Sequence, residues 1–230
     1  AEESEAIKCA VTKLLDRGET MANPRALKAI KDEGRALTDE KTWLEDTVIE
    51  KDDLLADVRR NKRKIHYGSL MTICSIKFYE RAPEFQKYKG RICFRGDNVR
   101  DQDGAVAVFA ELSASPTTVN NANCNLAYGL LSGHKTTTAD AVRAYIQSQL
   151  KGVETWVQVP KELWPDGWHK RGLKRPMCRL DKALYGHPDS GGYWERHLTE
   201  AIKVRGGIEF PNHPSSFWFE KTKLMLTVYV

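Results

Sequence analysis

Two strand-like segments separated by a polar loop constrain the fold of this chain most strongly. Residues 69–78, SLMTICSIKF, and residues 90–94, GRICF, are rich in β-branched and other apolar side chains. The stretch ERAPEFQKYK between them is polar and contains a proline. This pattern is typical of two strands joined by a surface loop. We therefore predict a β-hairpin, with strand character beginning near Ile65.

The first 60 residues have a different, helical and charged character. Apolar residues recur at helical spacing near the N-terminus, and Pro24 separates them from a second helical stretch, ALKAIKDEGRAL. We predict a peripheral helical lead-in over residues 1–60. The basic cluster RRNKRK, residues 59–64, is interpreted as a solvated loop or, alternatively, as a nuclear-import or nucleic-acid patch. The apolar positions near the N-terminus are Ile7, Ala10, Val11, Leu14 and Leu15.

The middle of the chain predicts a helix, a short strand and a second helix. Residues 115–133 favour a helix with Pro116 before it, a threonine cap and Gly133 as its end. Residues 134–140, HKTTTAD, favour a β-branched strand, and residues 141–150 place apolar side chains on one helical face. The apolar positions of the first helix are Val119, Ala122, Leu126 and Leu130.

The last quarter predicts one helix and one hairpin. The helix begins after Asp189 and Ser190, carries Trp194 and Ile202 on one face, and ends at residues 206–207. The segments SSFWFE and LMLTVYV form a hairpin around residues 221–223. Strands and helices alternate without a regular βαβ repeat, so the predicted class is α+β, an antiparallel sheet covered by helices on one face.

Charge is distributed unevenly along the chain. The net charge of +5 is the sum of −6 over residues 1–57 and +11 over residues 58–230. A phosphate-rich partner is therefore the leading candidate for the second part. No apolar run of 18 residues occurs, and the N-terminus has neither a basic nor an apolar leader region, so no membrane association is expected. We expect an intracellular location, cytoplasmic or nuclear.

The cysteines and histidines argue against a zinc site or a disulfide framework. The five cysteines are scattered and never form C-x-x-C, and the six histidines never recur at metal-ligand spacing. Any metal is therefore expected to be a hard ion held by carboxylates. The common nucleotide-binding, hydrolase and metalloprotease motifs are absent from the sequence.

One carboxylate stands at an informative position. In TADAVRAYIQ, Asp140 lies at the predicted strand-to-helix junction, five residues before Tyr145. An aspartate after a strand is most often a helix cap, and that interpretation stays open. If Asp140 instead coordinates a ligand, a helical turn would place the Tyr145 ring next to that ligand.

The order of five motifs resembles that of a known family. The chain contains, in this order, KGRICFRG, SPTTVNNANCNLAYGLL, TADAVRAYIQ, CRLDKALYG and LMLTVYV. This order resembles that of the copia-type reverse transcriptase domain of retrotransposon polyproteins. The corresponding motifs of that family are K-A-R-L-V-A-R-G, A-P-V-A-R, D-V-K-T-A-F-L, L-K-K-A-L-Y-G-L-K-Q and Y-V-D-D. The resemblance covers residues 26–230 and is strongest over residues 89–194. Trp43 also falls where the family has T-W before its first fingers strand.

The resemblance implies a fingers and partial palm fold with a two-metal polymerase centre. Asp140 matches the first catalytic aspartate, and the backbone carbonyl of Ala141 is an additional candidate ligand. Together with the aspartates of Y-V-D-D, they would hold two Mg²⁺ ions. One ion activates the primer 3′-hydroxyl and the other neutralises the dNTP triphosphate.

Further residues match the family's nucleotide-binding positions. Lys89, Arg91 and Arg95 match a basic fingers strand whose alternate side chains reach the triphosphate or template phosphates. An exposed basic edge strand is the alternative. Tyr145 matches the steric gate that favours deoxynucleotides, with packing in the helix as its alternative.

The fourth motif shapes the pocket for template and nucleotide. Tyr185 and Gly186 are its closest matches, an aromatic ring to pack and a glycine that lets the backbone approach a base pair. The family's L-K-Q-A-P-R is replaced by residues 187–192, HPDSGG, so its lysine and glutamine have no counterparts.

The resemblance also implies an incomplete catalytic centre and a domain order. Tyr229 and Val230 match the first two letters of Y-V-D-D, so the remaining aspartates lie outside the sequence and this chain alone is expected to be inactive. The expected regions are the lead-in, fingers-like strands over residues 61–115, and a partial palm over residues 116–230. Expected partners are an RNA template, a DNA or RNA primer and dNTPs. A non-catalytic nucleic-acid-binding remnant is the alternative.

Overall fold

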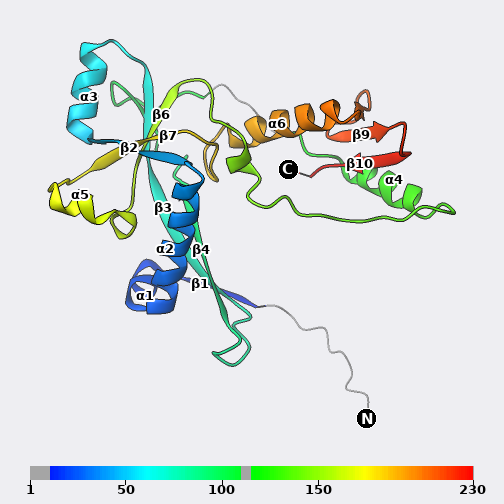
Figure 1. The fold of residues 1–230 in the computed structure, drawn as a ribbon, viewed down its shortest axis with the longest axis horizontal. Helices are drawn as coiled ribbons and strands as arrows, with labels where there is room; N and C mark the ends of the chain where they lie inside the picture. Colours follow the sequence, from blue (N-terminus) through cyan, green and yellow to red (C-terminus); the bar gives the residue numbers. More distant parts are fainter. Residues whose placement is uncertain (1–10, 110–114, 230) are drawn as a thin grey trace. The chain divides into compact units, whose positions relative to one another are not determined.

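The computed structural model describes residues 11–109 and 115–229, which form two compact units (Figure 1). Unit 1 contains the described parts of Ala1–Ala107 and Val153–Leu180, and unit 2 those of Val108–Gly152 and Asp181–Val230. These bounds differ from the three predicted regions, because a segment distant in sequence completes the sheet of unit 1. No helix in the described ranges is both long and apolar enough to cross a membrane.

Unit 1 is built on a seven-stranded sheet with the strand order β1-β3-β6-β7-β2, and strands β4 and β5 also pair with β3. Its helices are α1, α2, α3 and α5, with the 3-10 turn η2. The strands are β1 (Thr12–Leu15), β2 (Trp43–Glu50), β3 (Ile65–Lys77), β4 (Lys87–Phe94), β5 (Arg100–Asp101), β6 (Glu154–Gln158) and β7 (Pro176–Leu180). The helical elements are α1 (Arg17–Ala22), α2 (Pro24–Asp39), α3 (Lys51–Arg60), η2 (Lys161–Leu163) and α5 (Asp166–Lys170).

Strand β3 connects the two halves of this sheet. Its C-terminal half pairs with β1 and β4, and its N-terminal half pairs with β5 and β6. The pairing of β3 with β6 is parallel, whereas the other strand pairs of the sheet are antiparallel. The mixture of helices and strands confirms the predicted α+β class at a coarse level, but the expected antiparallel sheet contains one parallel pair, β3 with β6.

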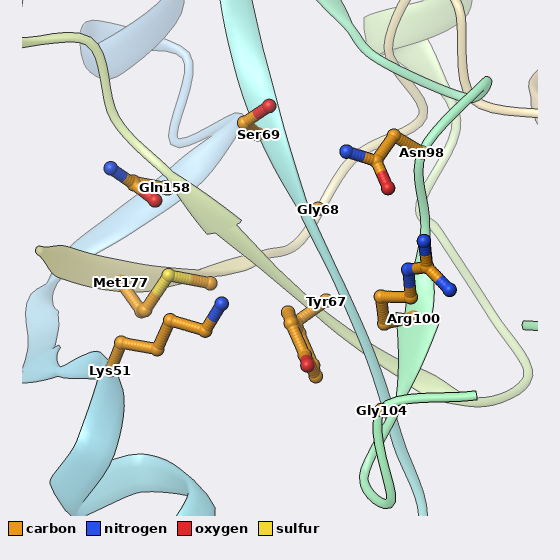
Figure 2. A pocket seen from close by; sticks show the side chains of 9 residues that line it. All are labelled: Lys51, Tyr67, Gly68, Ser69, Asn98, Arg100, Gly104, Gln158 and Met177. Atoms are coloured by element: carbon orange, nitrogen blue, oxygen red, sulfur yellow. The ribbon is translucent and has the colours of Figure 1, made fainter. Parts of the chain in front are cut away.

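A cavity of about 370 Å³ opens over the N-terminal half of β3 (Figure 2). Met177 on β7, Gln158 on β6 and Ser69 on β3 are successive cross-strand partners, so their side chains share one face of the sheet. Tyr67 lies two residues before Ser69 on the same face, opposite Arg100 of β5. These residues form the floor of the cavity.

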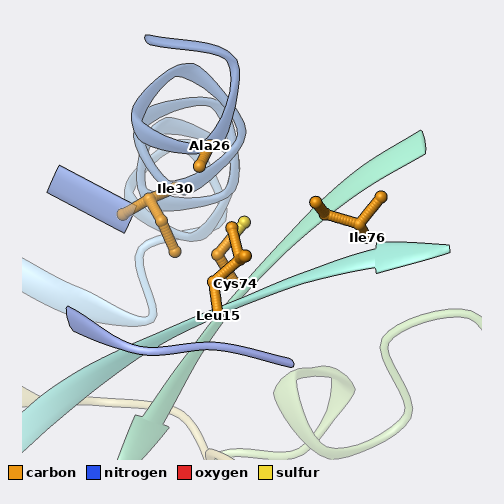
Figure 3. Close-up of a cluster of buried hydrophobic side chains, with 5 residues drawn as sticks. All are labelled: Leu15, Ala26, Ile30, Cys74 and Ile76. Atoms are coloured by element: carbon orange, nitrogen blue, oxygen red, sulfur yellow. The ribbon is translucent and has the colours of Figure 1, made fainter. Parts of the chain in front are cut away.

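Two apolar clusters pack helices α2 and α3 against the sheet of unit 1. Helix α2 covers β3 through Ala26 and Ile30, which pack with Leu15, Cys74 and Ile76 (Figure 3). Helix α3 packs through Leu54 and Val58 in a second cluster. The other buried members of that cluster are Ile65, Trp156 and Met177.

The two clusters use different faces of β3. Cys74 and Ile76 are at even positions of the strand, whereas Ile65 is at an odd position, and successive side chains of a strand point to opposite faces. Helices α2 and α3 therefore cover opposite faces, and the prediction that helices cover one face was wrong.

The predicted hairpin is confirmed. Strand β3 begins at Ile65 and pairs antiparallel with β4 from Leu70↔Phe94 to Lys77↔Lys87. The even side chains of β4 are buried or half-buried, and Lys87, Lys89 and Arg91 are exposed. Alternating burial of this kind is what a half-covered strand requires.

The predicted helical lead-in is only partly correct. Helix α2 is confirmed and has Pro24 in its first turn, where proline's missing N–H costs nothing. Val11 and residues 12–15 do not continue a helix: the segment Thr12–Leu15 is strand β1, because Leu15 pairs with Cys74 at the edge of the sheet. Strand β2 also lies in the expected lead-in and pairs with β7. Ile7 and Ala10 lie outside the described residues.

Glu162 of η2 ties α1 and β3 together inside unit 1. Its side chain is 4% exposed and accepts hydrogen bonds from Thr72 Oγ1 (2.8 Å) and the Arg17 guanidinium (3.2 Å). Burial by itself raises the pKa of Glu162, but its backbone N–H, Thr72 and Arg17 outweigh burial and hold the pKa below the ordinary value.

We expect Glu162→Gln to lower the free energy of unfolding by about 2 kcal/mol at pH 7, because charged hydrogen bonds are lost. Since the folded pKa is depressed, the stabilisation is complete above the unfolded value near 4.5 and is lost as the pH falls through the folded value. Urea unfolding at pH 7 and pH 3 should therefore show the difference from wild type shrinking with acid. The exposed Glu84 provides the control, Glu84→Gln; an equal loss there would contradict the assignment.

Unit 2 combines two helices with a three-stranded antiparallel sheet in the order β10-β9-β8. The predicted helix after Asp189 and the closing hairpin are both confirmed, with Trp194 and Ile202 buried. The elements are α4 (Val119–Gly129), η1 (Tyr145–Gln147), α6 (Ser190–Val204), β8 (Ile208–Glu209), β9 (Ser216–Phe219) and β10 (Leu224–Thr227).

Helix α4 is confirmed, but its predicted apolar face is not its packed face. Thr118 caps the helix by accepting a hydrogen bond from the Asn121 N–H (3.2 Å). Val119 and Leu126 are exposed, whereas Asn121 is buried and its Oδ1 lies 2.7 Å from His213 Nδ1. Asn125 donates to Thr227 of β10 at 3.0 Å, so polar contacts hold this helix.

The predicted strand over residues 134–140 and helix over residues 141–150 were wrong. Residues 134–140 are exposed and have no regular structure. Arg143 has a φ of 53°, which interrupts a right-handed helix, and only the 3-10 turn η1 forms. Residues 148–150 then run extended beside residues 181–183: Leu150 N–H donates to the Asp181 carbonyl at 2.9 Å.

Candidate nucleic-acid interface

Unit 1 presents a row of cations on one face of the β3–β4 hairpin. Lys87, Lys89 and Arg91 alternate along β4 and are exposed, and Lys77 of β3 lies opposite Lys87. We call these four side chains the basic strand face. The sequence prediction that Lys89 and Arg91 share one face of a strand is confirmed.

The basic strand face has no acidic counterpart. None of its four side chains makes a hydrogen bond or ion pair with another residue of the described ranges. Lys77 and Lys87 stand directly opposite each other, and like charges in that position destabilise an antiparallel pair. A bound anion would remove this repulsion.

Arg95 does not belong to this row of unpaired cations. It is exposed, and its guanidinium pairs with Asp97 at 2.9 Å. This hydrogen bond lowers the pKa of Asp97 and raises that of Arg95, so the two charges neutralise each other locally. Its backbone N–H donates to the Ser69 carbonyl (2.9 Å) and continues the strand pairing.

Unit 2 brings three of the predicted pocket residues together. The rings of Tyr145 and Tyr185 meet edge to face, with their centroids 4.6 Å apart. Tyr185 is 53% exposed and Tyr145 is half-buried. Gly186 follows with a φ of 87°, a conformation that favours glycine. Tyr185 therefore offers an accessible aromatic edge directly before Gly186, which has no side chain.

Most of the segment that replaces the family's L-K-Q-A-P-R is buried, although Pro188 is exposed. Ser190 donates to the Leu184 carbonyl (2.8 Å) and accepts from the Leu184 N–H (3.0 Å), which closes a turn before α6. His187 is 6% exposed, and its ring meets the ring of Phe109 edge to face. These residues contribute to packing and do not extend an open pocket.

Asp140 and Ala141 lie in the irregular segment before η1. Both are exposed, and Asp140 makes no hydrogen bond or ion pair with another described residue. Within residues 11–109 and 115–229, no group of three or more histidine, cysteine or acidic side chains is arranged to hold a metal ion. The described residues alone therefore do not complete a Mg²⁺ site around Asp140, and the predicted helix cap at Asp140 is absent as well.

Lys77 and Lys87 were missed by the sequence analysis. Lys87 stands two residues before Lys89 in K-Y-K-G-R, so the alternation that places Lys89 and Arg91 on one face also includes Lys87. Lys77 required the register of the hairpin, which pairs it with Lys87.

Comparison with known proteins yields no relative. No protein-family model, no curated protein and no solved structure matches the chain.

Proposed function

We propose that this chain is part of an RNA-directed DNA polymerase of the copia type, comprising its fingers and the first part of its palm. In this proposal Asp140 supplies the first carboxylate of a two-Mg²⁺ centre, and Ala141 supplies a backbone ligand. The partners are an RNA template, a primer strand and dNTPs. The proposal rests on the order of the five sequence motifs.

The basic strand face is the single structural observation that carries the proposal. Four exposed cations that pair with no acidic side chain in the described ranges repel one another and destabilise the hairpin, and Lys77 faces Lys87 directly. Phosphate oxygens along a nucleic-acid strand or a triphosphate would satisfy them. Lys89 and Arg91 are also the residues that the family motif places at the incoming nucleotide.

The tyrosine pair in unit 2 supports the nucleotide assignment. Tyr145 and Tyr185 come from different motifs of the resemblance, yet their rings are in contact. A half-buried Tyr145 in contact with Tyr185, the residue before Gly186, suits a ring held under a sugar, with Tyr185 fixing its position. This pair is the proposed nucleotide-discriminating element.

A second candidate is a non-catalytic nucleic-acid-binding protein derived from such an element. One observation favours it: Asp140 lies in an exposed irregular segment and not at the end of a strand. The basic strand face would then bind phosphates without chemistry. Magnesium-dependent nucleotide incorporation separates the two candidates.

Neutralising two cations of the basic strand face tests the interface. We expect Lys89→Gln with Arg91→Gln to weaken binding of a 12-nucleotide single-stranded RNA about 30-fold at 0.1 M salt. Each lost phosphate contact also lowers the slope of log K against log salt by about 0.7, hence by about 1.4 for both. Fluorescence anisotropy at several salt concentrations measures both quantities.

The matched control removes the same charge elsewhere in unit 1. Lys31 on α2 and Arg171 after α5 are exposed, so Lys31→Gln with Arg171→Gln gives the same net charge as the test variant. A control that weakens RNA binding equally would show that the protein's overall charge, not the basic strand face, determines affinity.

A further inference from the structure

The cavity over β3 gathers uncommitted polar side chains from distant segments. Lys51 begins α3, Ser69 lies on β3, Gln158 lies on β6, and Asn98 and Arg100 come from the chain after β4 (Figure 2). None of these five side chains makes a hydrogen bond or ion pair with another residue in the described part of the chain. Their donors therefore remain available to a ligand.

Three carboxylates close in sequence to Lys51, Asn98 and Arg100 have other partners. Asp52, next to Lys51, pairs with Arg175 at 2.6 Å. Asp101 accepts the N–H groups of two residues of its own turn, each at 2.9 Å. Asp97 pairs with Arg95. The lining therefore contains two cations and no acidic residue.

Lys51 lies near a second cation, Arg175. Its ammonium lies 4.5 Å from the centre of the Tyr67 ring. Burial and the nearby charge of Arg175 lower the pKa of Lys51, and Asp52 only partly opposes them. A bound anion would favour the charged form of this lysine.

We propose that this cavity binds a small phosphorylated ligand. Lys51 and Arg100 would provide the charges for the phosphate oxygens, and Ser69, Asn98 and Gln158 would provide neutral hydrogen bonds. A cavity of about 370 Å³ lies at the small end of ligand pockets, which suits pyrophosphate or a nucleoside monophosphate. Gly104 has a φ of 85°, a conformation that favours glycine. The turn next to the Tyr67 hydroxyl therefore carries no side chain at this position.

The cavity is separate from the basic strand face. Ser69 lies four residues before Ile73, the cross-strand partner of Arg91, which corresponds to about 13 Å along β3. One phosphate group cannot contact both sites. The proposal therefore does not depend on the polymerase assignment, and either can fail without the other.

Isothermal titration calorimetry with pyrophosphate on the full chain tests this site. We expect Lys51→Gln and Arg100→Gln each to weaken binding about tenfold, and the double variant about 100-fold, because each change removes a charged contact. Lys31→Gln with Arg171→Gln is again the charge-matched control. A control that loses as much affinity as the double variant, or a wild-type protein that does not bind pyrophosphate, would overturn the proposal.

A wild-type measurement keeps the test independent of variant folding. In amide NMR spectra, pyrophosphate should shift the signals of Ser69 and Gly104 and leave those of Lys89 and Arg91 unchanged. Shifts confined to β4 would assign the anion to the basic strand face instead. Titrations with inorganic phosphate, AMP and the 12-nucleotide RNA then distinguish a free phosphate, a mononucleotide and a strand phosphate as the source of the group.

Discussion

Gly90→Ala is expected to lower the free energy of unfolding of unit 1 by about 3 kcal/mol. A Cβ atom at Gly90 would lie 2.5 Å from the carbonyl oxygen of Ala29 and 2.9 Å from the backbone nitrogen of Ile30. These are main-chain atoms of α2, so no side-chain rotation can relieve the overlap. Helix α2 would have to move away from β4 and loosen the cluster around Ile30.

Gly167→Ala is the matched control in the same unit. No atom lies within 4 Å of the Cβ that this change would add, and Gly167 lies in α5, where alanine is favoured over glycine by about 0.5 kcal/mol or more. Urea unfolding followed by tryptophan fluorescence should therefore separate the two variants by more than 3 kcal/mol. Similar midpoints for both would mean that α2 does not approach β4 as closely as the structure has it.

The elements that the sequence predicted correctly have local signals that agree with their tertiary contacts. The β3–β4 hairpin combines β-branched residues with an alternation that matches its burial, and α6 has a buried apolar stripe and a glycine at its end, Gly206 with a φ of 88°. Helix α2 likewise begins at a proline behind the capping residue Asn23, whose side chain accepts the Arg25 N–H at 2.9 Å.

In the mispredicted elements, tertiary contacts outweigh the local preference of the sequence. Val11, Leu14 and Leu15 suit a helical face, but pairing with the edge of β3 makes residues 12–15 a strand in which Leu14 is exposed. The threonines of residues 136–138 favour a strand, yet that segment is exposed and irregular. The left-handed φ of Arg143 could not be predicted, because arginine has no preference for it.

Of the two candidate sites, the basic strand face could be predicted in part from the sequence, and the cavity over β3 could not. The family resemblance, read with the alternation of a strand, placed Lys89 and Arg91 on one face. The cavity over β3 could not be predicted, since its lining includes residues of α3, β3, β5, β6 and β7, and only the register of those strands brings Lys51 and Arg100 to one place. A cation is common on any surface; two cations without an acidic partner in one cavity become evident only in three dimensions.

Asp140→Asn is expected to reduce magnesium-dependent dNTP incorporation on a primed RNA template at least about 1,000-fold, in a polypeptide that continues through the Asp-Asp pair of the Y-V-D-D motif. The amide keeps the size of the side chain but removes the charge that two Mg²⁺ ions require. Asp140 is exposed and makes no hydrogen bond or ion pair with another described residue, so the change should alter the free energy of unfolding by less than about 0.5 kcal/mol.

This separation of stability from activity makes the result interpretable. The Asn variant should bind the RNA as tightly as wild type, because the basic strand face is intact, and Glu200→Gln, another exposed acidic position of unit 2, should leave incorporation unchanged. Loss of incorporation with binding and stability preserved would identify Asp140 as a metal ligand. A wild-type polypeptide that folds and binds the template but incorporates no nucleotide would instead support the non-catalytic candidate, because phosphate binding by Lys89 and Arg91 requires no metal centre.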